Sequence, residues 1–200
     1  MAGEGDLDER SETQEAIMEA TYSALQKCGY ADLTIQAIAD EFAKSKSLLY
    51  YHYDTKDDLL VDVLMDSLDR LSVEETVDAS KPPQAQLETF LDNMLPATLD
   101  EDDRAFRVTI VELRAQAPMD EAYREQFARA DRLVRNTLTE ILDGGIETGD
   151  FRDIDVPYTV DLLLSLVEGA ITRHLVTSEE ATVDARDTVD RYLEANVYAG

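Results

Sequence analysis

Residues 34–56 read TIQAIADEFAKSKSLLYYHYDTK, and this stretch decides the fold. It predicts a short helix that ends near Phe42, a tight turn, and a second short helix from about Ser45 to Tyr51. Apolar side chains can form a buried stripe on the first helix, whereas hydroxyls and aromatic rings crowd the second. This combination is typical of a helix-turn-helix, in which the buried stripe fixes the angle between two helices and the other face offers polar groups to a major groove.

Helical periodicity continues on both sides of this stretch. A first helix is expected from Ser11, a fourth follows the helix-turn-helix, and five more apolar runs at helical spacing come after it. The sequence SKPP at 80–83 is the clearest break, and the pair Gly144-Gly145 is expected to end a long helix. Since no strand pattern occurs, we expect an all-α protein of about nine helices.

The chain carries an extreme negative charge. It has 44 acidic residues against 18 basic ones, a net charge of -26, and only five lysines. Within residues 27–56, however, four acidic residues are balanced by four lysines, so the remainder of the chain carries the whole net charge. Four of the five lysines therefore lie in the segment that contains the helix-turn-helix.

We interpret the overall acidity as adaptation to a halophilic cytoplasm at molar salt, where acidic surfaces stay hydrated. At about 1 M salt the Debye length is roughly 3 Å, so distant carboxylates hardly repel a polyanion while lysines in contact range still act. The gain from counterion release shrinks under the same conditions. Hydrogen bonds, shape and apolar contacts are therefore expected to carry more of any affinity for a nucleic acid than bulk charge does.

Composition also bears on location. The single cysteine, Cys28, excludes an internal disulfide and fits a reducing compartment. The N-terminal sequence MAGEGDLDER is acidic where a secretory leader would be basic and then apolar, and no apolar run approaches the roughly 18 residues of a membrane span. We expect a cytoplasmic protein without a membrane partner.

The helix-turn-helix stretch resembles the DNA-binding signature of the tetracycline-repressor (TetR) family. The residues that carry the resemblance are Thr34, Ile38, Ala39, Ser45, Lys46, Leu49 to Tyr53, Lys56 and Leu59. The resemblance implies an N-terminal three-helix DNA-binding head and a C-terminal helical bundle for ligand binding and dimerisation. It further implies a homodimeric repressor that binds a palindromic operator in double-stranded DNA and is released by a small-molecule effector, without a cofactor.

Four parts of the chain are expected on this basis. A flexible acidic arm covers residues 1–9, and a helix-turn-helix DNA-binding domain covers 10–55. A connecting helix occupies 56–80, and an effector-binding and dimerisation domain occupies 81–200.

Several residues of the head are candidate DNA contacts. Thr34 is expected to cap its helix and to meet a phosphate. Lys46 and Ser47 occupy the first turn of the recognition helix, from which base edges are reached. Tyr50 is expected on a phosphate and Tyr51 in the groove. The full set is Thr34, Lys44, Ser45, Lys46, Ser47, Tyr50, Tyr51, His52 and Lys56.

Other positions in the head have different expected roles. Leu49 and Tyr53, four residues apart, are expected to face inward. His52 is expected to meet a phosphate or a helix end and not a metal, because His174 lies in a different region and no cysteine accompanies either. The turn at Ala43-Lys44 departs from the family pattern, which usually has a glycine and a small apolar residue.

The body of the chain is similar to the bodies of choline-type or drug-type repressors of the family over residues 106–151. The expected effector pocket is apolar, although ordinary core packing is favoured for each of its residues taken singly. Glu112 and Arg114 interrupt an apolar helix and are compatible with either a ligand contact or a salt bridge. The pocket residues are Phe90, Met94, Phe106, Ile110, Tyr123, Phe127 and Leu163.

The helix expected over 156–176 is apolar around much of its circumference, which a surface helix does not need. It is either central to its own domain or part of a dimer interface, and the resemblance favours the interface. The residues expected there are Leu164, Val167, Ile171, His174, Val189, Tyr192 and Leu193.

Two other function classes stay open at this point. The chain is also compatible with an acidic helical dimer that pairs with protein or, less favoured, with a small-molecule enzyme. It contains no nucleophile elbow, phosphate loop, Cys-His cluster or HExxH motif. We therefore expect no catalytic residues and no metal ligands.

Overall fold

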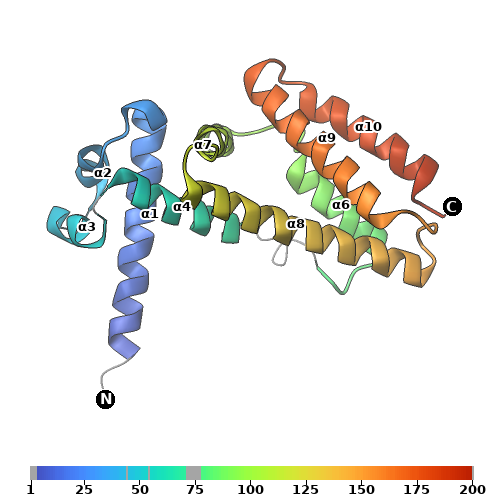
Figure 1. Ribbon diagram of the computed structural model, residues 1–200, viewed down its shortest axis with the longest axis horizontal. Helices are drawn as coiled ribbons and strands as arrows, with labels where there is room; N and C mark the ends of the chain where they lie inside the picture. Colours follow the sequence, from blue (N-terminus) through green and yellow to red (C-terminus); the bar gives the residue numbers. More distant parts are fainter. Residues whose placement is uncertain (1–3, 44, 54, 71–77, 200) are drawn as a thin grey trace. The chain divides into compact units, whose positions relative to one another are not determined.

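The computed structural model describes residues 4–43, 45–53, 55–70 and 78–199. Within these ranges the chain forms nine α-helices and no β-sheet (Figure 1), which confirms the all-α prediction. No helix of the described residues is long and apolar enough to cross a membrane. The helices are α1 Glu4–Asp32, α2 Ile35–Glu41, α3 Lys46–His52, α4 Lys56–Arg70, α6 Pro83–Met94, α7 Glu101–Gln116, α8 Glu121–Thr148, α9 Val156–Val176 and α10 Ala181–Asn196.

The chain divides into two compact units. The first comprises Met1–Ser67 and Ala105–Gln126, and the second comprises Leu68–Arg104 and Phe127–Gly200. This grouping differs from the predicted boundaries at 55 and 80, because most of α7 and the start of α8 belong with the N-terminal helices. Helix α1 also begins at Glu4, inside the segment expected to be a flexible arm. The acidic composition of that segment did not reveal its helical continuation.

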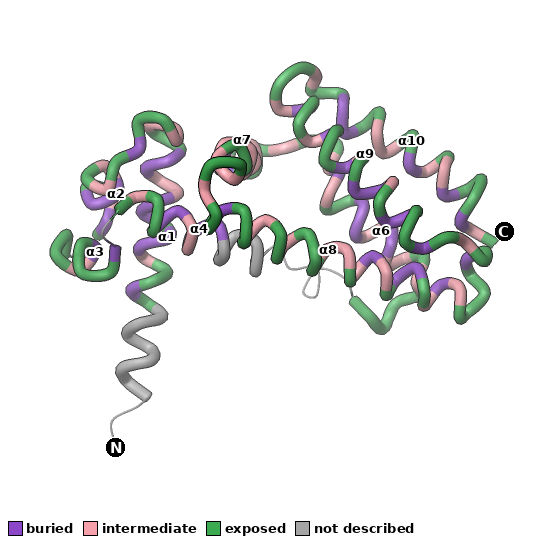
Figure 2. Tube along the Cα trace, in the orientation of Figure 1, coloured by how far each residue is buried: buried purple, intermediate pink, exposed green. Residues whose placement is uncertain are grey.

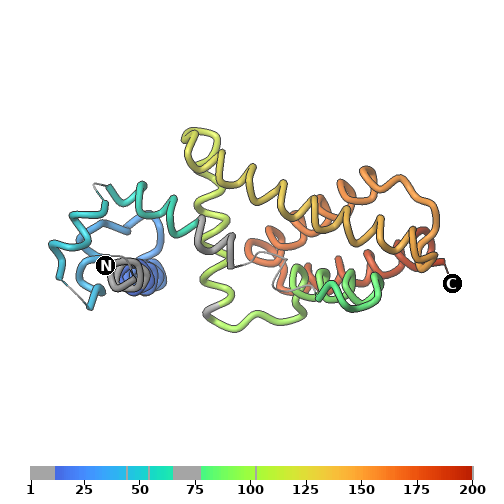
Figure 3. The backbone as a smooth tube through the Cα atoms, turned by 90° about the horizontal axis from the view of Figure 1, so that it is seen from below, coloured from blue at the N-terminus to red at the C-terminus, as the bar shows by residue number. Residues whose placement is uncertain are grey.

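The first unit is built around α1. Figure 3 views α1 nearly end-on, with α2, α3 and α4 beside it. The apolar side chains of Ile17, Ile38 and Leu59, from three different helices, are all buried. Ser23 of α1 donates a hydrogen bond to Glu41 of α2 at 2.9 Å. Apolar burial and this polar tie fix α2 on α1.

Helix α7 joins the first unit through both apolar and polar contacts. The rings of Tyr22 and Phe106 lie 6.2 Å apart, centroid to centroid. The backbone N–H of Tyr30 donates to the carboxylate of Glu112 at 3.3 Å. The sequence-based boundaries did not anticipate this packing because α7 begins 69 residues after the end of α1 in the chain.

The second unit is a bundle of α6, α9, α10 and most of α8. Figure 2 shows buried residues on all three of α6, α9 and α10. Fully buried members of one core include Leu87 and Leu91 on α6, Leu142 on α8, Leu163 on α9 and Leu193 on α10. Burying each such side chain contributes about 1.5–3 kcal/mol. This shared core explains why the apolar run in α9 extends around so much of the helix.

Helix α8 does not end at Gly144-Gly145 as predicted but continues to Thr148. It ends at Gly149, whose φ of 81° lies in the left-handed region that glycine adopts readily. Gly145 has a different purpose. A Cβ at that position would lie 2.0 Å from Cδ2 of the buried Phe151 ring, so the absence of a side chain lets Phe151 fold back against the helix.

The two adjacent glycines give a matched test. Gly145→Ala is expected to lower the free energy of unfolding by about 2 kcal/mol, because the new methyl must displace the Phe151 ring from the core. Gly144→Ala meets nothing within 4 Å, so it should raise stability by up to about 1 kcal/mol through helix propensity. Urea unfolding in molar potassium chloride measures both. Equal effects at the two positions would contradict this explanation.

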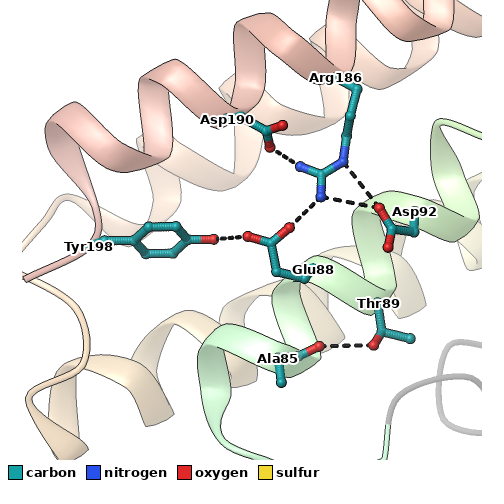
Figure 4. Close-up of polar contacts among 7 residues, drawn as sticks. All are labelled: Ala85, Glu88, Thr89, Asp92, Arg186, Asp190 and Tyr198. Carbon is teal, nitrogen blue, oxygen red and sulfur yellow. Dashed lines mark hydrogen bonds and ion pairs between the residues drawn. The ribbon is translucent and has the colours of Figure 1, made fainter. Parts of the chain in front are cut away.

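Arg186 links α10 to α6 (Figure 4). Its guanidinium forms ion pairs with Glu88, Asp92 and Asp190, and Tyr198 donates to the second oxygen of Glu88 at 2.6 Å. The Arg186 side chain is only 18% exposed. Burial raises the pKa of Asp190, although the guanidinium opposes that shift. One cation therefore holds three carboxylates together in a partly desolvated place.

Arg186→Met is expected to lower the free energy of unfolding by about 2–4 kcal/mol, because three carboxylates then lose their shared partner. The loss should shrink as the pH falls from 7 toward 5. Without the guanidinium the pKa of Asp190 rises further, and a carboxyl whose pKa is raised by folding favours the folded state at low pH.

Arg135→Met is the matched control for this prediction. Arg135 also binds two carboxylates, those of Asp131 and Asp161, but its side chain is 40% exposed. Its replacement should lower stability by less than about 1 kcal/mol. Equal losses for the two variants would show that burial does not set the strength of the Arg186 cluster.

Candidate DNA-binding surface

Helices α2 and α3 are each seven residues long and are held by caps and by burial. The Thr34 hydroxyl accepts from the N–H of Ala37 at 3.1 Å, as expected of an N-cap. Ser45 occupies the N-cap of α3, but its side chain makes no capping hydrogen bond. Leu49 is fully buried and Tyr53 is buried, with its hydroxyl donating to Asp62 of α4 at 2.9 Å. Both side chains face inward as predicted.

Most of the predicted contact residues lie together on the outer side of α2 and α3. Tyr51 is 83% exposed, although a large aromatic ring normally finds cover in a folded chain. Its ring packs edge-on against His52, 5.3 Å between centroids. Lys56 is half-buried, and Lys44 lies outside the described residues. The exposed members of the set are Thr34, Ser45, Lys46, Ser47, Tyr50, Tyr51 and His52.

A polar network connects α2 with the exposed side of α3. Lys46 forms an ion pair with Asp40, and Gln36 donates to the same carboxylate at 2.9 Å. Tyr50 in turn donates to the side-chain oxygen of Gln36 at 3.2 Å. The hydrogen bond from Lys46, followed by that from Gln36, lowers the pKa of Asp40. A fixed negative charge therefore stands beside the recognition helix.

Sequence reasoning missed Gln36 and Asp40. The available signal was their four-residue spacing on α2, opposite the buried pair Ile38 and Ala39. This spacing places both side chains on the exposed face of the helix.

The other described lysines of the head are also engaged within the chain. Lys27 forms an ion pair with Glu41 at 2.6 Å. The Lys56 ammonium lies 4.7 Å from the centre of the Tyr30 ring and donates to the Tyr30 carbonyl at 3.4 Å. Lys27, Lys46 and Lys56, the lysines of the 27–56 segment that the structure describes, are therefore each paired with a local partner.

A cavity of about 260 Å³ is lined by residues of α1, α4 and the C-terminal end of α3. None of the seven predicted effector-pocket residues lines it. The cavity is lined by Thr13, Gln14, Ile17, His52, Tyr53 and Asp62.

Among the described residues, no group of three or more histidine, cysteine, aspartate and glutamate side chains could hold a metal ion.

The seven residues of the predicted effector pocket are divided between the two units. Phe106, Ile110 and Tyr123 belong to the first unit, and Phe90, Met94, Phe127 and Leu163 belong to the second. Phe90 and Leu163 are buried in one core, and Met94 packs against that core. Tyr123 is buried, and its hydroxyl finds no hydrogen-bond partner among the described residues. The pocket stays a prediction.

Most of the residues predicted for the dimer interface point into the chain's own core. Leu164, Val167, His174, Val189 and Leu193 are all buried within a single chain. The His174 ring is already satisfied by the Thr182 hydroxyl, 3.2 Å from Nδ1. Only Ile171 and Tyr192 are half-buried. These five side chains are already covered within one chain and leave little surface for a partner chain to bury, and the predicted interface stays a prediction.

Comparison with known proteins settles the family. Residues 17–63 match the family model described as bacterial regulatory proteins, tetR family, and residues 83–197 match the model of the BetI-type transcriptional repressor C-terminal region. The chain belongs to the TetR family. The match to the first model covers α2 and α3, so the recognition surface lies in the family's DNA-binding region, and the chain is a DNA-binding transcriptional regulator.

Individual proteins that are similar to this TetR-family regulator are also described as transcriptional regulators. A TetR regulator of Haloarcula marismortui is 38% identical, with a TM-score of 0.84, over 94% of this chain and 99% of that one. A regulator of Saccharomonospora viridis, solved in complex with choline, is 21% identical with a TM-score of 0.78, over 94% of this chain and 98% of that one. The helix-turn-helix regulator YdeS of Bacillus subtilis is 25% identical over 94% of this chain and 89% of its own.

The network of Asp40 suggests a test by salt dependence. In Asp40→Asn, Lys46 loses its ion pair and becomes free to reach a phosphate. We expect tighter binding to random-sequence duplex DNA and a plot of log affinity against log salt that is steeper by about 0.9 for each Lys46 that makes the contact. Fluorescence polarisation over a potassium chloride series measures the slope.

Asp187→Asn is the control for Asp40→Asn, since it removes the same charge from an exposed position on α10. It should leave the slope unchanged. An unaltered slope in Asp40→Asn would contradict the view that the ion pair withholds Lys46 from DNA.

Proposed function

We propose that this TetR-family regulator is a homodimeric repressor that binds a palindromic operator and is released by a small-molecule effector. The observation that carries the proposal is the exposed Tyr51 on a helix fixed from behind by the buried Leu49. An exposed ring on a rigid helix suits contact with thymine methyls in a major groove. The neighbouring hydroxyls of Ser45, Ser47 and Tyr50 suit phosphates and base edges.

The outer face of α9 supports the homodimer. One stripe along this helix contains no charged residue and is exposed except at Leu162, which is half-buried. Its alternating spacing of four and three residues is the spacing of helices that pack lengthwise on a partner. We therefore replace the predicted interface residues on α9 by this stripe. It consists of Tyr158, Leu162, Ser165, Gly169, Thr172 and Val176.

A second copy has a clear use for an operator-binding protein. Two identical heads related by a two-fold axis match two half-sites of a palindrome about one helical turn apart. An effector that favours a different spacing of the heads competes with the operator by shifting this equilibrium. Choline is the first compound to test as an effector, because a solved relative of the same fold holds it.

We infer a working environment of high salt in the cytoplasm. The net charge of -26 is tolerable near DNA only when distant charges are screened. The paired lysines of the head also fit such conditions, because salt weakens exposed ion pairs and so lowers the work of separating Lys46 from Asp40.

The test is a fluorescence-polarisation titration of duplex fragments from upstream of the protein's own gene, against random duplex, in molar potassium chloride. Light scattering on the same sample reports the oligomeric state. We expect dimeric protein to select one fragment. Tyr51→Ala should abolish that selectivity without changing the melting temperature, because the side chain packs on little else. A dimer that binds every fragment like random DNA would refute the proposal.

Two further variants test which part of the Tyr51 side chain contacts DNA and whether the effect is specific to this position. Tyr51→Phe should keep most of the selectivity if the ring touches thymine methyls, and lose it if the hydroxyl is the contact. Met119→Ala is the surface control, because Met119 is also a large exposed side chain of the first unit. It should bind DNA like the unaltered protein.

A further inference from the structure

The backbone of Tyr30 joins three other parts of the first unit. Gly29 leaves the helical conformation, with φ 69° and ψ 170°, so the Tyr30 N–H no longer follows the α1 ladder. That N–H donates to Oε2 of Glu112 on α7 at 3.3 Å. The carbonyl oxygen of the same residue accepts from the Leu33 N–H at 3.3 Å and from the Lys56 ammonium at 3.4 Å.

Lys56 is held in place before any DNA arrives. Its ammonium touches both the carbonyl and the ring face of Tyr30, and the side chain is half-buried. A free lysine side chain loses rotamer entropy when it is fixed. Lys56 has given up part of this freedom already, so a phosphate contact from the start of α4 needs less further ordering.

The surroundings of Tyr30 are acidic. Burial, followed by the charges of Asp57, Asp120 and Glu112, raises the pKa of the Tyr30 phenol, which therefore stays neutral. By charge alone, Glu112 should oppose the approach of DNA. By position, however, Glu112 should favour DNA binding, because its carboxylate accepts from the Tyr30 N–H that the kink at Gly29 leaves without a helical partner.

We propose that Glu112 is a positioning residue for the DNA contact of Lys56. Its carboxylate holds the backbone N–H of Tyr30, and the backbone carbonyl and ring of the same residue hold the ammonium. The inference rests on the proposed function, since it takes Lys56 to bind an operator phosphate. The proposal also links α7 directly to the DNA-binding head. A shift of α7 that withdraws Glu112 frees the backbone of Tyr30, and with it both Lys56 and the Leu33 turn that precedes the Thr34 cap.

Charge and position predict opposite results for Glu112→Ala, which makes the experiment decisive. Loss of one carboxylate from a chain of net charge -26 should strengthen DNA binding if only charge matters. If Glu112 positions Lys56, affinity for the selected upstream fragment should fall about five- to tenfold. The salt slope should become shallower by about 0.9 for each head, the value for one lost phosphate contact.

Glu112→Gln separates the hydrogen bond from the charge. The glutamine oxygen can still accept from the Tyr30 N–H, so affinity and slope should stay near those of the unaltered protein. Glu125→Ala removes the same charge from an exposed site at the start of α8, in the same unit. It should leave affinity unchanged or raise it slightly.

A double substitution tests the route itself. Lys56→Gln alone should give the shallower slope, and adding Glu112→Ala to it should change the slope no further. Circular dichroism and urea unfolding show whether each variant is folded. The slope stays informative if Glu112→Ala reduces the amount of folded protein, provided that circular dichroism gives the same folded fraction at every salt concentration of the series.

The outcomes distinguish the two levels of the proposal. If the unaltered protein selects no fragment, the proposed function fails. If it selects one and Lys56→Gln flattens the slope, but Glu112→Ala tightens binding or leaves the slope unchanged, only the role of Glu112 is refuted. A shallower slope in Glu112→Ala that is restored in Glu112→Gln supports it.

Discussion

The buried side chain of Leu49 is the contact on which the recognition surface depends. A helix of seven residues is too short to persist alone in water, where about 12–15 residues are marginal. Helix α3 therefore exists because Leu49 is fully covered and because the phenol of Tyr53 is fixed to Asp62 of α4. Every exposed group of this helix takes its direction from those two anchors. The hydroxyls and Tyr51 can then be offered to DNA without each being stabilised individually.

How much the sequence could predict follows from the range of each interaction. The Thr34 cap and the inward turn of Leu49 and Tyr53 depend on spacing within one or two turns, and they were predicted. The partners of Lys46 and Glu112 lie on other helices. Spacing can place Asp40 on an exposed face of α2, but it does not show which side chain of another helix it meets. The burial of the predicted α9 residues within the chain was not foreseen for a related reason. An apolar pattern around the whole helix indicates that several of its faces are covered. It does not show which face packs within the same chain and which packs on a partner chain.

Each described lysine of the head has its own partner close by, whatever the net charge of the whole chain. Lys27, Lys46 and Lys56 lie against Glu41, Asp40 and the Tyr30 ring and carbonyl, respectively. The surface offered to DNA is therefore closer to an ordered set of dipoles than to a patch of positive charge. Such a surface loses the long-range attraction that speeds association. It keeps the short-range geometry by which base sequences are distinguished.

The Arg186 cluster and the Lys46 pair differ in their access to solvent, and salt should act on them differently. Mobile ions screen the exposed pair on α3 strongly, whereas the guanidinium between α6 and α10 is mostly out of their reach. Rising ionic strength would then loosen the internal bonds of the recognition surface while the bundle stays intact. Salt concentration therefore acts mainly on the recognition surface, where internal ion pairs must be exchanged for contacts with DNA.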